Sequence, residues 1–131
     1  MRRDVYSGHL KLFGEEDRDT LLTANNYASS LVALEQFEEA KALMRKTMPI
    51  ARRVLGEDHE HMLKFRWTYA QSLYEDPAAT PDDLREAVTT LEDAERIARR
   101  VFGGAHPLTE GIEEDLRDAQ ALRARSPSES S

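Results

Sequence analysis

One segment of the chain returns almost unchanged. Residues 50–59 read IARRVLGEDH, residues 97–106 read IARRVFGGAH, and a shorter echo, LFGEED, lies at 12–17. The glycines of the three copies, Gly14, Gly56 and Gly103, stand 42 and 47 residues apart. Repeats of this length are typical of stacked α-helical units, each of which covers the apolar face of the next. We therefore expect an all-α array of repeated units.

The two spacings differ because the second unit carries an insertion. Residues 37–56 align with 84–103 without a gap, and residues 20–31 align with 62–73 at an offset of 42. The five additional residues must then lie within 75–83, between the two helices of the second unit. Identical pairs include Ala40 and Ala87, Ile50 and Ile97, and Val54 and Val101.

Apolar residues spaced three and four apart predict six helices. Their expected ranges are about 3–13, 18–34, 36–55, 60–75, 81–102 and 107–124. Each repeated glycine is placed to stop a helix in a left-handed conformation just after the last turn. Thr80-Pro81-Asp82-Asp83 is a helix start signal, and so is His106-Pro107. Pro49 lies inside the third range and predicts a bend there.

Composition limits the classes of partner. The chain has 131 residues, a net charge of −7 and no cysteine. We expect one domain, 1–124, followed by a disordered tail, 125–131. The acidic balance argues against nucleic acid and anionic membrane as partners. No apolar run resembles a signal peptide or a membrane span, so we expect a soluble, cytoplasmic protein.

Small residues recur where paired helices would touch. Ala28 and Ala40 are twelve apart, and Ala70 and Ala87 repeat the pair once the insertion is removed. With the 42-residue period, the segment NNYA at 25–28 and the loop LGEDH at 55–59, the chain resembles the tetratricopeptide (TPR) family, and within it the kinesin light chain-like subclass. The resemblance implies an α-solenoid of antiparallel helix pairs, a TPR-like superhelix of about two and a half repeats. Arg117 departs from the small-residue pattern and marks the last helix as a cap.

The resemblance also implies a peptide-binding concave face formed by the first helix of each unit. The corresponding residues are Leu22, Asn25, Asn26, Ser29, Val32, Lys64, Trp67, Thr68, Gln71 and Tyr74. Asparagine amides offer donors and acceptors to an extended backbone, and Trp67 and Tyr74 offer rigid aromatic surface. Glu114, Asp115 and Asp118 add an acidic end, so the expected partner is a protein or peptide with an apolar anchor and basic residues.

Each of these residues also has a purely structural interpretation. Trp67 could pack under a neighbouring helix, and the two asparagines could lack a ligand. A clamp for a terminal carboxylate needs several basic residues, and only Lys64 is in register. His59 and His106 occupy the same repeat position, which indicates a capping role, so we expect no metal and no cofactor. The arginine pairs at 52–53 and 99–100 are expected to solvate helix ends, with an anion-binding patch as the alternative.

Three functions remain open from the sequence. The first is a non-enzymatic protein–protein interaction scaffold that binds a peptide or partner helix, because no catalytic motif is present. The second is a self-associating structural module, a homodimer with no groove ligand. The third is an accessory domain of a larger enzyme, since 103–107 share the Gly-x-x-His-Pro pattern with the TPR-like tail of SET/MYND methyltransferases.

Overall fold

The structure is a computed structural model that describes residues 2–125, and this part of the chain contains six α-helices and no strand. The helices are α1 (Arg2–Phe13), α2 (Arg18–Ala33), α3 (Phe37–Leu55), α4 (Glu60–Tyr74), α5 (Pro81–Phe102) and α6 (Pro107–Ala124). Each begins and ends within one residue of its expected range. The all-α prediction is confirmed, while 126–131 of the expected tail lie outside the described residues.

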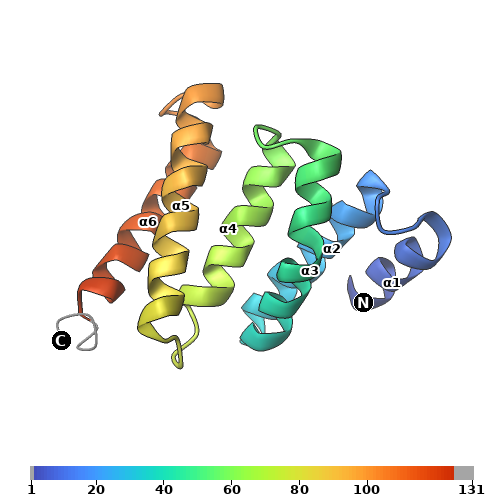
Figure 1. Ribbon diagram of the computed structural model, residues 1–131, viewed down its shortest axis with the longest axis horizontal. Helices are drawn as coiled ribbons and strands as arrows, with labels where there is room; N and C mark the ends of the chain where they lie inside the picture. Colours follow the sequence, from blue (N-terminus) through green and yellow to red (C-terminus); the bar gives the residue numbers. More distant parts are fainter. Residues whose placement is uncertain (1, 126–131) are drawn as a thin grey trace.

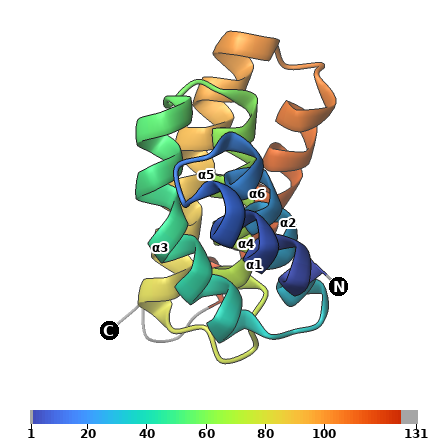
Figure 2. The ribbon, with the colours of Figure 1, turned by 90° about the vertical axis from the view of Figure 1, so that its right-hand side faces the viewer.

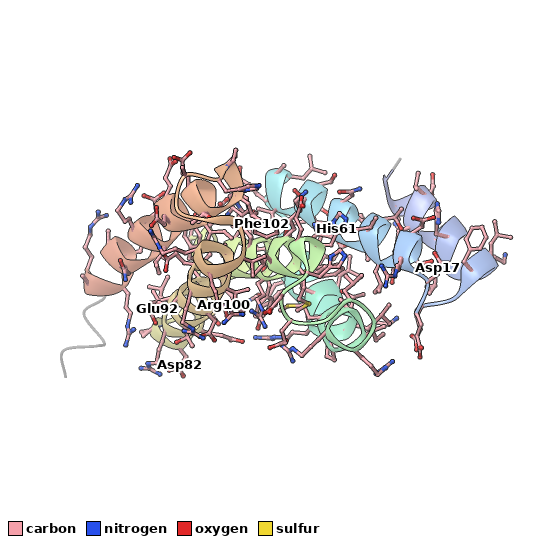
Figure 3. All side chains as sticks on the ribbon, turned by 90° about the horizontal axis from the view of Figure 1, so that it is seen from above. Asp17, His61, Asp82, Glu92, Arg100 and Phe102 are labelled. Carbon is pink, nitrogen blue, oxygen red and sulfur yellow. The ribbon has the colours of Figure 1, made fainter. Side chains whose placement is uncertain are left out.

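The helices form an open row, with α1 at one end and α6 at the other (Figure 1). Each packs against its neighbour in the chain, and α4 additionally contacts both α2 and α6. Seen from above, α2 and α6 lie along one side of the row, and α3 and α5 lie along the other (Figure 3). This two-layered arrangement of consecutive helices is that of a TPR-like solenoid.

Side chains cap the start of four helices. Asp17 accepts hydrogen bonds from the backbone N–H groups of residues 19 and 20, and Thr80 forms a reciprocal capping box with Asp83 at the start of α5. His59 and His106 cap α4 and α6 through their Nδ1 atoms, which accept from the N–H groups of residues 61 and 108. The predicted start signals at Thr80 and His106 are therefore confirmed.

The repeated glycines end α1, α3 and α5 with positive φ, as expected. Gly56 and Gly103 have φ of 91° and 89°, but their ψ values of 158° and 160° place them outside the left-handed helical region. They also stand at the C-cap itself. The predicted left-handed helical conformation is therefore wrong for these two glycines, because the chain turns away at once into the loop before the next helix. Residues with a Cβ rarely adopt this extended, positive-φ conformation.

Helix α2 ends without a glycine. Glu35 has φ of 61°, the only positive φ of a non-glycine residue among residues 2–125. The N–H of Gln36 bonds to the carbonyl of Leu31 at 2.8 Å, and that of Glu35 bonds to Val32 at 2.9 Å. These two bonds form a Schellman motif. Glu35 takes the left-handed position of this motif, at a cost of about 1–2 kcal/mol for a residue that has a Cβ.

The core runs along the contacts between helices. Ala28, Ala40, Ala70 and Ala87 are completely buried, which is consistent with close approach of the paired helices at these positions. Larger side chains such as Phe65 fill the space between units. Arg66 is also buried, and its Nη2 binds Glu57 Oε2 at 2.8 Å while no partner for Nη1 is found within residues 2–125.

Helix α3 continues through Pro49 from Phe37 to Leu55. Proline has no N–H to offer the carbonyl four residues earlier, so one helical hydrogen bond is missing at this exposed position. None of the six helices combines the length and the apolar composition that crossing a bilayer requires.

Candidate functional site

A groove lies between α2 and α4. Its cavity has a volume of about 240 Å³ and is lined by Asn25, Ser29, Lys64, Trp67, Thr68 and Gln71. All six residues belong to the set expected on the inner face. They meet because the first helix of each unit contacts the first helix of the next.

The other four residues of that set do not line this groove. Leu22 is half-buried and Asn26 is exposed. Val32 is 8% exposed and packs in a small apolar cluster with Leu31 and Phe37. Tyr74 is 7% exposed and lines a separate hollow beside the inserted loop. The repeat places each of the four on the inner face of its own helix, but contacts with neighbouring helices bury Val32 and Tyr74.

Asn25 carries the most unusual atom of the groove. Its side-chain oxygen Oδ1 is buried, and no hydrogen-bond donor reaches it within residues 2–125. A buried polar atom left unpaired costs about 1–3 kcal/mol, so such atoms are rare in native proteins. Because the atom is buried, a ligand donor in the groove can reach it only when the Asn25 amide turns toward the groove.

Larger hollows lie elsewhere but lack this feature. One of about 700 Å³ is lined by Arg3, Tyr27 and the end of α2, and one of about 620 Å³ lies beside the loop after α4. Four buried side-chain atoms in residues 2–125 have no partner, in His9, Asn25, Arg66 and Thr109. Only that of Asn25 belongs to a residue that lines one of these cavities.

Trp67 connects the groove to α6. Its Nε1–H donates to Asp115 Oδ2 at 2.6 Å, and Gln71 Nε2 donates to the same oxygen at 3.0 Å. The indole lies directly against Gly111, where a Cβ would come within 2.4 Å of Trp67 Cη2. The ring is therefore both a half-buried wall of the groove and a fixed contact between α4 and α6. The sequence predicted Asp115 only as part of an acidic end, because periodicity does not reveal a contact between two residues that lie 48 positions apart on different helices.

Acidic side chains gather where α4 ends beside α6. Burial raises the pKa of Tyr74, and nearby Asp115 and Glu75 raise it further. Burial likewise raises the pKa of Glu75, with additional repulsion from Asp115 and Asp118. This end of the inner face is therefore rich in negative charge that a cationic group would stabilise.

Lys64 supplies positive charge at the opposite end of α4. Its Nζ lies 3.2 Å from Glu60 Oε2, one turn earlier on the same helix. The hydrogen bond from Lys64 lowers the pKa of Glu60. Because Lys64 and Glu75 are eleven residues apart, the charge along α4 changes sign over roughly 16 Å.

Two histidines and two arginines of the repeated segments bind partners within the chain. His59 and His106 cap helices through Nδ1, and within residues 2–125 no cluster of three or more possible metal ligands is found. Arg53 Nη2 binds Glu16 at 3.1 Å, and Arg100 Nη2 binds Asp58 at 2.9 Å. These arginines thus pair with acids of the chain in the same way in both units.

Comparison with known families gives one finding. A family model described as tetratricopeptide repeat matches residues 20–61, which cover α2, α3 and the start of α4. This match supports a tetratricopeptide repeat protein. A comparison with curated proteins gives no match.

Proposed function

From the match of residues 20–61 to the tetratricopeptide repeat, we propose that the chain is a non-enzymatic module that binds a protein partner through an extended peptide in the groove between α2 and α4. Tetratricopeptide repeats are in general protein–protein interaction modules. The 42-residue spacing of Gly14 and Gly56 favours the kinesin light chain-like subclass.

The unpaired oxygen of Asn25 carries this proposal. If the Asn25 amide turns toward the cavity of about 240 Å³, Oδ1 can accept a hydrogen bond from a peptide backbone N–H, which would relieve an unfavourable feature of the free protein. Ser29 and Thr68 lie in the same lining and offer hydroxyl groups to the neighbouring backbone atoms.

The charges along α4 suggest the orientation and composition of the ligand. Lys64 favours an acidic group or a carbonyl at one end, while Glu75, Asp115 and Asp118 favour a basic side chain at the other. The half-buried indole of Trp67 provides apolar surface between them. The proposed ligand is therefore a short peptide with an apolar anchor followed by lysine or arginine.

The experiment begins with peptides selected from a random library on the immobilised protein, whose Kd is then measured by fluorescence anisotropy. Asn25→Ala should weaken binding about five- to twentyfold, because one buried hydrogen bond is lost. The same substitution removes an unpaired acceptor, so the free protein should be as stable as the wild type or more stable. Trp67→Ala is unsuitable as the main test, since it also breaks the contact with α6.

Matched lysine variants provide the control. Lys64→Glu should lower the affinity for the peptide severalfold. Lys46 is an exposed lysine on α3, and Lys46→Glu should leave the affinity unchanged. Backbone NMR of the complex should shift the signals of residues 25, 29, 64, 68 and 71. Selected peptides that bind with equal affinity to wild type and Asn25→Ala would rule out the groove as the binding site.

A further inference from the structure

An ion pair recurs at the same place in two units, and its basic position in α1 has no acidic partner within residues 2–125. Arg53 and Arg100 occupy the same repeat position near the ends of α3 and α5, and each pairs with an acid in the loop that precedes the first helix of its unit. Lys11 stands at this position in α1, 42 residues before Arg53. It is exposed, and no acidic partner for it is found within residues 2–125.

The outer face of α1 is apolar and uncovered. Val5 and Leu12 are 50% and 77% exposed, and a Cβ built on Gly8 between them would meet nothing within 4 Å. In α3 the corresponding residues are Thr47, which is buried, and Val54, which packs against the core. Helix α2 packs against α3, whereas no helix of residues 2–125 occupies the equivalent place beside α1, which stands at the end of the row and nearest the viewer in Figure 2.

We propose that this outer face, formed by Val5, Gly8, Lys11 and Leu12, is a docking site for an amphipathic helix of a partner protein. The chain contains the template for this contact in residues 16–24, where Glu16 precedes α2 and pairs with Arg53 while Leu21 is buried in the first turns. The partner helix would lie antiparallel to α1, with an acid before its first turn to pair with Lys11 and a leucine-like side chain over Val5 and Leu12. This surface is distinct from the groove between α2 and α4 and does not depend on the function proposed for that groove.

A second copy of the chain does not fit this face. Helix α6 occupies the place of the first helix of a unit, and no second helix follows it within residues 2–125. Its side chains nevertheless differ from those of α2: where α2 has Leu21, Ala24, Ala28 and Leu31, α6 has Glu110, Glu113, Arg117 and Gln120. The loop before α6 has Gly104 and Ala105 where the other loops have acids, so Lys11 would remain unpaired. Two α1 helices packed on each other would likewise bring no acid to either lysine.

The test uses a synthetic, helix-stapled peptide with the sequence of residues 15–34 as the probe and measures its Kd for the full chain by fluorescence anisotropy. Leu12→Glu should weaken binding at least tenfold, because it places a charge against the apolar contact. Lys11→Glu should weaken binding severalfold, and a peptide carrying Glu16→Lys should restore the affinity of the Lys11→Glu protein. Leu122→Glu, an exposed leucine on α6, is the matched control and should leave the Kd unchanged.

Three results would overturn the proposal. The first is absence of binding at millimolar peptide. The second is binding that is insensitive to Lys11→Glu and Leu12→Glu, because the peptide would then have replaced the chain's own α2 on α3. The third is a concentration-dependent dimer in light scattering that Leu12→Glu converts to a monomer, which would assign the face to a second copy. Circular dichroism of the variants checks that α1 remains folded.

Discussion

Trp67 of α4 lies closely against Gly111 of α6. A Cβ at position 111 would lie 2.4 Å from Cη2 and 2.8 Å from Cζ2 of the indole. The ring has little room to move, because its Nε1 is held by Asp115. The same contact defines one wall of the groove, so the groove and the packing of α6 depend on a single side chain.

We expect Gly111→Ala to destabilise the protein by as much as about 2 kcal/mol. Overpacking costs about 1–3 kcal/mol, which exceeds the helix-propensity gain of about 1 kcal/mol for replacing glycine with alanine. Gly8→Ala is the control: its Cβ would meet nothing within 4 Å, so it should stabilise α1 by about 0.5–1 kcal/mol. Urea unfolding followed by the emission of Trp67 measures both changes. Equal stabilisation by the two substitutions would show that the indole moves aside freely.

At the scale of single helices, α3 and α5 are copies that differ at one costly position. Both end at a glycine of the same conformation, and both carry acidic residues in the first turn and arginines in the last, where they favour the helix dipole. Pro49 of α3 corresponds to Arg96 of α5, and both side chains are exposed. The proline therefore removes a backbone hydrogen bond without contributing buried surface.

Pro49→Arg should raise the stability by as much as about 3 kcal/mol, since it restores the hydrogen bond to the carbonyl of residue 45 and removes the steric conflict with that turn. The reciprocal change, Arg96→Pro, should lower the stability by a similar amount. Thermal unfolding monitored by circular dichroism compares the two variants with the wild type. If Pro49→Arg has no effect on the melting temperature, α3 must be held by tertiary contacts that already absorb the defect.

At the scale of the whole molecule, the stability depends on pH through His61, which lies in the first turn of α4. Burial lowers the pKa of His61 below its ordinary value of 6.5, and the proximity of His59 and Lys64 lowers it further. Between that lowered pKa and pH 6.5 the native state binds fewer protons than the unfolded state, so stability falls as pH falls.

We therefore expect the wild type to lose stability between pH 7.5 and 5.5, because the unfolded chain takes up a proton on His61 before the folded protein does. Glu75, whose pKa is raised in the folded state, acts in the opposite sense, but only as pH falls toward the carboxylate range. The variant His61→Gln lacks the titrating imidazole, so it should lose distinctly less stability over the same range. Urea midpoints at the two pH values provide the measurement, and equal pH dependence of the wild type and His61→Gln would contradict the assignment.

Local sequence alone determined the six helices, their ends and their order. The spacing of apolar residues, the glycines and the capping residues act over a few residues, so they are legible without any tertiary contact. The repeat then predicted the solenoid. The resemblance to the tetratricopeptide repeat predicted ten residues on the inner face, of which six line the groove between α2 and α4, because equivalent positions in successive units face the same side.

Only the tertiary structure decided what those side chains do. It buried Val32 and Tyr74, fixed Trp67 to Asp115 and Gly111, and left Asn25 Oδ1 without a donor. It also left the outer face of α1 uncovered. These outcomes depend on the distances between helices far apart in the chain, and periodicity specifies which face a residue occupies but not what lies opposite it.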